Sequence, residues 1–309
     1  MYVLFRKELA DHLDSVRFLI VLAMALLIGG VSLYAALGGI VDATAASNVS
    51  GFVFLRLFVT GSGNINSFVW FVAMFGPIIG MILGFDAINS EKSAGTLNRL
   101  LAQPIYRDDV INGKFLAGVT VIAIIVISMV LLVAGVGLLR IGVPPSGEEV
   151  MRLIVFTLFS IVYVSFWLGL AILLSVVTRH AASSVIAVVV VWLALGLLMS
   201  LITSGLAGAL YPPDGTQAME EGRVIFQQTF SRISPTMLYS EATSTILDPS
   251  IRLTSWAPGL QIGGVVPGAL PLGQSLLLVW PYLIGIIAET VAAFVISYIV
   301  FMKQEIRGA

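Results

Sequence analysis

The residue types that usually carry enzyme chemistry are scarce in this chain, and those present lie far apart. The sequence contains no cysteine and two histidines, His12 and His180. A zinc hydrolase needs several ligands close together, and a serine nucleophile needs a histidine base beside it. We therefore expect no active site and no bound metal within this chain.

Phosphate chemistry lacks its usual motif as well. A P-loop ATPase wraps phosphates in the backbone N–H groups of a GxxxxGK[ST] sequence. The single Gly-Lys pair, Gly113-Lys114, is instead followed by Phe115 and opens an apolar stretch. We therefore expect that this chain hydrolyses no ATP.

Glu289 is an acid in the middle of an otherwise uncharged apolar segment. An ionised carboxylate surrounded by hydrocarbon costs several kcal/mol, so this group should be neutral, paired or turned toward a polar cavity. Two roles stay open for this intramembrane polar site. Glu289 could carry a proton or a substrate, or it could hydrogen-bond a Ser, Thr or Tyr side chain on a neighbouring helix.

The overall composition indicates a membrane protein. Of the 309 residues, 58% are hydrophobic and 11% are charged, with a formal net charge of −1. The mean hydropathy is +1.03, whereas soluble domains carry about 25% charged residues. The charge balance excludes a broad basic surface for nucleic acid. No cleavage site follows the first apolar run, so we expect that run to stay in the mature protein.

Six apolar segments are long enough to cross a membrane as helices. A hydrocarbon core of about 30 Å needs about 20 helical residues, and lipid offers the backbone no hydrogen-bond partners. The segments are residues 18–41, 67–85, 115–139, 153–177, 181–204 and 275–302. The expected fold class is an all-α polytopic membrane protein with six transmembrane helices, five of them within residues 18–204 and the sixth within residues 275–309.

The distribution of basic residues predicts the orientation. Most of the 16 lysines and arginines lie in the termini, in the 86–114 connection and in the turn after residue 177. Basic residues concentrate on the cytoplasmic side. We therefore expect a multi-pass protein of the inner, cytoplasmic membrane, with both termini inside and the 205–274 segment outside.

Residues 1–17 have the pattern of an amphipathic helix that lies on the membrane surface. Its expected apolar stripe consists of Phe5, Leu9, Leu13 and Val16. The 86–114 connection is charge-dense and must project into water. Within it, the spacing of Leu97, Leu100 and Leu101 predicts a short helix with an apolar face. A solvated helix of this kind usually has a protein partner.

The 205–274 segment is too long for a plain loop and should contain structure of its own. Residues 216–233 place Met219, Phe226, Phe230 and Ile233 on one helical face, which predicts an external helix covering the bundle. The Gly- and Pro-rich residues 257–273 are uncharged and suit a re-entrant turn.

Two smaller patterns predict packing and exposure. Gly76, Gly80 and Gly84 recur at four-residue steps, which favours close contact between helices, within the chain rather than between two chains. A second group of charges flanks Pro144-Pro145, and we expect these side chains to belong to a solvated turn. They are Arg140, Glu148, Glu149 and Arg152.

These features together resemble the permease subunits of the type-2 ABC exporter family. The motifs that carry the resemblance are Arg6-Lys7-Glu8-Leu9, Glu91-Lys92-x-x-Gly95-Thr96-Leu97, and Pro104-Ile105-x-Arg107 through Gly113-Lys114. The topology agrees over essentially the whole chain. The resemblance implies a non-catalytic permease that couples ATP hydrolysis on a separate cytoplasmic ABC ATPase to export. Substrates of this family vary widely, so the resemblance names none.

The same resemblance implies the partners and their contact sites. Two ATPase subunits, which bind ATP and Mg²⁺, would dock beneath two permease copies that form a homodimer or a heterodimer. The N-terminal helix is similar to the interfacial connecting helix of the family, and the turn at residues 178–182 would be a second ATPase contact. The coupling helix that docks on the ATPase would contain Glu91, Lys92, Gly95, Thr96, Leu97, Arg99, Leu100 and Leu101.

Two other functions stay open from the sequence. A secondary transporter driven by an ion gradient would use Glu289, but it usually shows repeated halves, and none is evident. A membrane-anchored assembly protein would bind an external partner protein through the 205–274 segment. Copurification of an ATPase separates both from the permease.

Overall fold

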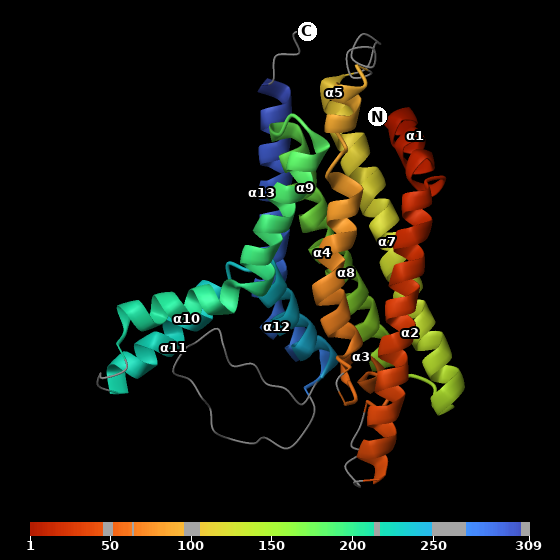
Figure 1. Ribbon diagram of the computed structural model, residues 1–309. Coiled ribbons are helices and arrows are strands. Elements are labelled where there is room, and N and C mark those ends of the chain that lie inside the picture. Colours follow the sequence, from red (N-terminus) through yellow and green to blue (C-terminus); the bar gives the residue numbers. More distant parts are fainter. Residues whose placement is uncertain (46–51, 64, 96–105, 213–216, 249–269, 304–309) are drawn as a thin grey trace.

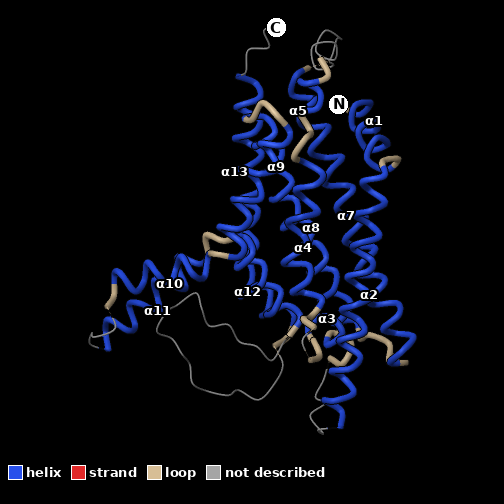
Figure 2. Tube along the Cα trace, viewed as in Figure 1, coloured by secondary structure: helices blue, strands red, loops and turns tan. Residues whose placement is uncertain are grey.

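The protein is helical throughout the part that can be described. The computed structural model describes residues 1–45, 52–63, 65–95, 106–212, 217–248 and 270–303, and these contain helices and no strand (Figures 1 and 2). The first helices are α1 (Tyr2–Leu13), α2 (Val16–Ala45), α3 (Arg56–Val59), α4 (Phe68–Gly84) and α5 (Asn89–Ser93). They are followed by α7 (Arg107–Ile141), α8 (Gly147–Val177), α9 (Ala181–Trp192), a π-helix (Leu193–Leu197), α10 (Met199–Leu210), α11 (Gln217–Ser231), α12 (Pro235–Leu247) and α13 (Leu272–Lys303). The all-α prediction is confirmed.

Five of these helices are long and apolar enough to cross a membrane. They are α2, the stretch Phe68–Ser93 that contains α4 and α5, α7, α8 and α13, and α13 ends at the same end of the bundle as α1 and α5 (Figure 1). The sixth predicted span is a broken pair, in which Ala181–Leu197 and Met199–Leu210 meet at 60°. The bundle therefore has six spans only if this bent pair is counted as one.

The span predicted over residues 181–204 is bent, and a π-helical turn precedes the bend. The Leu198 N–H donates to the Leu193 carbonyl at 2.8 Å, which is a five-residue step. The Ser234 hydroxyl donates to the Leu195 carbonyl at 2.5 Å. A side chain that inserts into the helical hydrogen-bond ladder is a known cause of kinks. The sequence of this span gives no indication that Ser234 contacts it.

Helix α8 lies at the centre of the bundle and packs closely on α4. Its Tyr163, Trp167 and Phe156 are fully buried. A Cβ atom added to Gly80 would lie 2.6 Å from the Val164 carbonyl oxygen, and one added to Gly84 would lie 2.8 Å from the Ala171 Cβ. The predicted close packing at these glycines within the chain is thus confirmed.

Helix α12 enters the bundle from the far side of the molecule and packs on α8 and α13. Its Tyr239 is fully buried, stacks on Tyr163 at 4.3 Å between ring centroids, and hydrogen-bonds Ser160 at 2.8 Å. This buried helix is absent from the sequence prediction. The re-entrant turn predicted at residues 257–273 lies outside the described residues except for its last four, where α13 begins.

Helices α10 and α11 form a hairpin that projects sideways from the bundle (Figure 1). The helix predicted over residues 216–233 is confirmed as α11, but its predicted packing on the bundle is wrong. It packs chiefly on α10, where Tyr211 and Phe226 have ring centroids 6.2 Å apart. Of its predicted apolar face, Met219 and Ile233 are exposed.

Arg152 in α8 is fully buried, so the solvated turn predicted around it is wrong for this residue. Its guanidinium donates to the Glu148 carboxylate at 2.8 Å, to the Ile246 carbonyl at 2.7 Å and to the Leu270 carbonyl at 2.5 Å. Glu149 is also buried and accepts from the Phe54 N–H at 3.0 Å. Arg152 therefore joins the end of α12, the start of α13 and α8.

Candidate functional site

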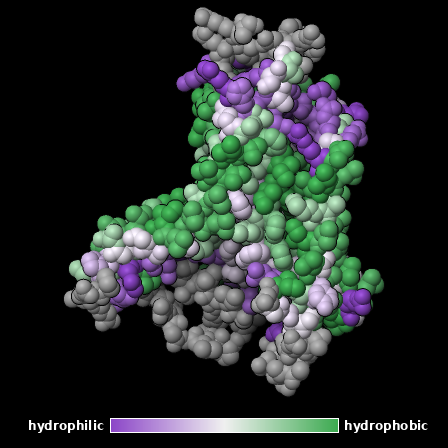
Figure 3. Space-filling model, in the orientation of Figure 1, coloured by the Kyte–Doolittle hydropathy of each residue, from purple (hydrophilic) through white to green (hydrophobic). Residues whose placement is uncertain are grey.

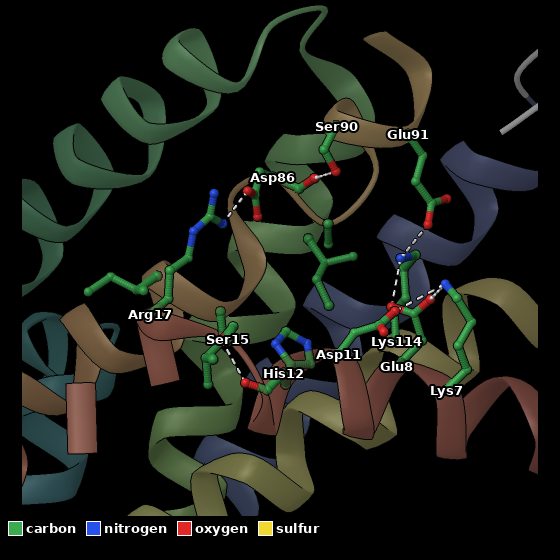
Figure 4. A pocket seen from close by; sticks show the side chains of 14 residues that line it. Lys7, Glu8, Asp11, His12, Ser15, Arg17, Asp86, Ser90, Glu91 and Lys114 are labelled. Atoms are coloured by element: carbon green, nitrogen blue, oxygen red, sulfur yellow. Dashed lines mark hydrogen bonds and ion pairs between the residues drawn. The ribbon is translucent and has the colours of Figure 1, made fainter. Parts of the chain in front are cut away.

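Charged side chains from several helices converge at the end of the bundle that carries the N-terminus. Helix α1, the end of α4, α5 and the start of α7 surround a pocket of about 280 Å³ (Figure 4). The same end of the molecule is hydrophilic on its surface, whereas the middle of the bundle is hydrophobic (Figure 3). We call this region the charged junction. Its central members are Glu8, Lys114 and Glu91.

Lys114 is the centre of the charged junction. Its ammonium lies 2.9 Å from the Glu8 carboxylate of α1 and 2.7 Å from the Glu91 carboxylate of α5. The Lys114 and Glu8 side chains are each 8% exposed, and Glu91 is 15% exposed. Because a buried charge is tolerated only when it is paired, these contacts fix the three helices relative to one another.

Gly113 allows α1 to approach α7 closely enough for this pairing. A Cβ atom at Gly113 would lie 3.2 Å from the Leu4 side chain and 3.5 Å from the Phe5 amide nitrogen. Leu4 and Glu8 are one helical turn apart on the buried face of α1. The Gly-Lys pair, which forms no phosphate loop, therefore has a packing role and an electrostatic role.

Helix α5 is anchored to the end of α8 by hydrogen bonds at its first residues. The Ser175 hydroxyl accepts from the backbone N–H groups of Ile88 and Asn89 at 3.1 and 3.2 Å. The Asn89 side-chain amide donates to the Thr178 hydroxyl at 3.0 Å. The first N–H groups of a helix have no partners within it, so another helix supplies them here. The described start of the predicted coupling helix thus lies beside the turn at residues 178–182, the other segment predicted to contact an ATPase.

The α5 side chain Lys92 also contacts α8. Its ammonium donates to the Val176 carbonyl, in the last turn of α8, at 3.1 Å. A cation is favoured at a helix C-terminus, where the unsatisfied carbonyl groups carry partial negative charge. Helix α5 is therefore held by α8 on one side and by Lys114 on the other.

Glu8 is stabilised as a carboxylate in spite of its burial. Burial alone would raise its pKa, but the ammonium groups of Lys114 and Lys7 outweigh that effect and the pKa is lowered. His12 lies one turn further along α1 at the same pocket, and burial lowers its pKa, which favours the neutral imidazole. Arg17 forms an ion pair with Asp86 across the pocket (Figure 4).

The structure describes only part of the predicted coupling helix. Glu91 and Lys92 lie in α5, and Gly95 follows it with a φ of 67°, a left-handed conformation that suits glycine. The other five predicted positions lie outside the described residues. They are Thr96, Leu97, Arg99, Leu100 and Leu101.

The predicted apolar stripe of the N-terminal helix is only partly reproduced. Leu9 and Leu13 pack against the core, Phe5 is half-buried, and Val16 is 70% exposed at the start of α2. The contact between Glu8 and Lys114 was not predicted from the sequence. The sequence did contain one indication of this contact. Glu8 lies one helical turn after the apolar Leu4, so the two side chains share one face of the N-terminal helix.

Glu289 lies in α13, away from the charged junction. Its Oε2 atom is buried and has no hydrogen-bond partner among the described residues, so the predicted interhelical hydrogen bond is not formed by this atom. The described part of the chain also contains no group of three or more metal-ligating side chains. The ion pairs of the charged junction join α1, α5 and α7.

Comparison with known proteins gives a consistent result over nearly the whole chain. The model of a family described as ABC-2 family transporter protein matches residues 2–306. Two relatives are each described as a probable ABC transporter permease protein NosY. The one from Pseudomonas aeruginosa is 31% identical over 126 residues, and the one from Stutzerimonas stutzeri is 30% identical over 122 residues. Each alignment spans 40% of this chain and 40% of the relative.

Proposed function

The chain belongs to the ABC-2 family of transporter proteins, and on that premise we propose that it couples ATP hydrolysis by a separate ABC ATPase to substrate export. In this proposal the end with the termini faces the cytoplasm, and the membrane is the inner membrane of the cell. ATP and Mg²⁺ bind to the ATPase and not to this chain. The substrate stays open.

The observation that carries the proposal is the ion triad of Glu8, Lys114 and Glu91. It joins the N-terminal helix, the described start of the predicted docking segment and a membrane span within one buried contact. A partner that pushes on α5 therefore also pushes on α7 and α1. Movement of a docked ATPase can reach the membrane only through such a stiff connection.

Helix α8 extends this connection across the bundle. Its last turn holds α5 through Ser175, and it packs along α4 and α13 over most of its length. Rigid helices transmit displacement because packed cores do not deform gradually. A movement at the ATPase side would thus be delivered to three spans at once.

The family relationship supports an ATPase partner for this chain. We propose two copies of this chain and two ATPase subunits, with the predicted Leu97, Leu100 and Leu101 face docked on the ATPase. A few residues near the centre of an interface usually supply most of the binding energy.

Copurification with an ABC ATPase from the same cells tests the proposal. The tagged chain in mild detergent is expected to retain the ATPase, and Leu97→Asp with Leu100→Asp should abolish that retention because a buried carboxylate is costly. Glu221→Gln, at an exposed position, serves as the control. Retention by the double variant would place the docking site elsewhere, and no retention by the wild-type chain would contradict the proposal.

A further inference from the structure

The α10–α11 hairpin extends beyond the bundle and is not accounted for by the coupling mechanism. Helix α10 has no charged residue, and its exposed apolar side chains include Leu201 at 67%, Leu206 at 42% and Leu210 at 61%. Two of its polar side chains are satisfied internally, because Thr203 and Ser204 donate to the carbonyls of Ser200 and Leu201 at 3.0 Å. These two side chains therefore do not depend on water for a hydrogen-bond partner.

Helix α11 has the opposite character on its outer side. It carries Glu220, Glu221 and Arg223, and Glu220 pairs with Arg223 on the surface. In Figure 3 one side of the hairpin is hydrophobic and continuous with the hydrophobic middle of the bundle, and hydrophilic residues gather toward its tip on the other side. The hairpin as a unit is amphipathic.

The depth of the bend places the hairpin near a membrane boundary. The chain enters α9 just after Arg179 and His180, and the helical stretch Ala181–Leu197 is about 25 Å long at about 1.5 Å per residue. The hydrocarbon core is about 30 Å thick. The 60° bend therefore lies close to the boundary opposite the termini, where α10 turns toward the membrane plane.

The outward apolar stripe of α9 continues into α10 across this bend. Its members lie in α9, in the π-helical turn and in α10. They are Ile186, Val190, Leu193, Leu197 and Leu201, all exposed. The surface that faces away from the bundle in the membrane-spanning part is thus continuous with the exposed surface of α10.

We propose that the α10–α11 hairpin lies in the lipid–water interface opposite the termini, with α10 seated among the lipid acyl chains and the Glu220–Glu221 side of α11 in water. The occupant of the exposed α10 face is a lipid surface. An amphipathic element of this kind binds an interface through its buried apolar area while its charged side stays hydrated. The hairpin would hold the bent span at a fixed depth in the membrane.

The absence of cysteine makes a direct test possible, because a single introduced cysteine can be labelled without background. Leu206→Cys on α10, Glu221→Cys on α11 and Ile284→Cys on the exposed face of α13 are each labelled with an environment-sensitive fluorophore. Ile284 is 51% exposed on a spanning helix and serves as the lipid-facing reference. The full chain is reconstituted in phosphatidylcholine vesicles with brominated acyl chains, and iodide is the aqueous quencher.

The proposal expects brominated lipid to quench position 206 as strongly as position 284, and iodide to quench position 221 only. Equal iodide quenching at 206 and 221 would overturn it, since the hairpin would then lie in water. Protection of position 206 from both quenchers, with crosslinking to a second copy, would also overturn it. Leu210→Cys repeats the measurement if the first variant does not fold.

Discussion

At the scale of single residues, Lys114 connects acids on two different helices. Replacing Lys114 with Met should lower the free energy of unfolding by about 3 kcal/mol, because removing one partner of a buried ion pair leaves uncompensated charge. It should also lower substrate-stimulated ATPase activity while the ATPase still copurifies. Thermal unfolding in detergent and the ATPase rate measure the two effects.

A double-mutant cycle separates the ion pair from general packing. Lys114→Met, Glu8→Gln and their combination should show a coupling energy of about 0.5–3 kcal/mol, as contacting residues usually do. Lys114→Arg, which keeps the charge, should retain more activity than the Met variant. Additive effects of the two single variants would mean that the contact contributes nothing to coupling.

Arg152 stabilises the opposite end of the bundle. Arg152→Met should destabilise the protein by about 1–3 kcal/mol, because the carbonyls of Ile246 and Leu270 lose a buried donor, whereas the partly exposed Glu148 can be hydrated without its partner. The matched control is Arg140→Met, at an exposed position in the same predicted turn, where almost no change is expected. The melting temperatures of both variants test this prediction. Equal values would contradict the buried contacts of Arg152.

The sequence alone does not reveal the buried contacts of Lys114 and Arg152. Arg152 donates to backbone carbonyls about a hundred positions away, and a backbone carbonyl leaves no trace in the side-chain pattern. Lys114 stands directly before an apolar span, a position where a basic residue usually marks the membrane boundary. Its burial depends on Glu8 and Glu91, which only the folded chain brings near.

At the scale of helices, the glycine positions of α4 offer a test of packing against intrinsic propensity. Gly80→Ala should destabilise the protein by about 1–3 kcal/mol, since the new Cβ would meet the backbone of α8 at 2.6 Å. Gly135→Ala in α7 should instead stabilise it by up to about 1 kcal/mol, because no described atom lies within 4 Å of the added Cβ. The melting temperatures of the two variants should therefore shift in opposite directions. A shift in the same direction would argue against the α4–α8 contact.

Helix prediction succeeded where length and hydrophobicity alone decide the outcome. Five spans follow directly from apolar stretches that exceed the bilayer thickness. Helix α12 was missed because its sequence is half polar, with Ser, Thr and Tyr side chains that find partners only inside the fold, such as Tyr239 with Ser160. The bend after α9 was missed for a related reason, since Ser234 reaches it from a distant segment.

At the scale of the whole molecule, α8 joins two buried charge clusters at opposite ends of the bundle. One end of α8 holds Arg152, and the other holds α5 through Ser175 and Val176. Its core residues are almost completely buried between these ends. In the proposed coupling, movement at the ATPase side would reach the other end of the bundle through α8, which connects the two ends.

The proposed assembly of two permease copies and two ATPase subunits is testable on the intact complex. Native mass spectrometry should show two chains of 32.9 kDa together with two ATPase subunits. Two differently tagged copies expressed together should copurify, whereas copies mixed after solubilisation should not, because an interface formed in the membrane exchanges slowly. A complex containing one copy would exclude the homodimer. In mixed complexes, one copy with Leu97→Asp and Leu100→Asp should lower ATP-driven transport, since an unanchored ATPase cannot drive its side of a symmetric pair.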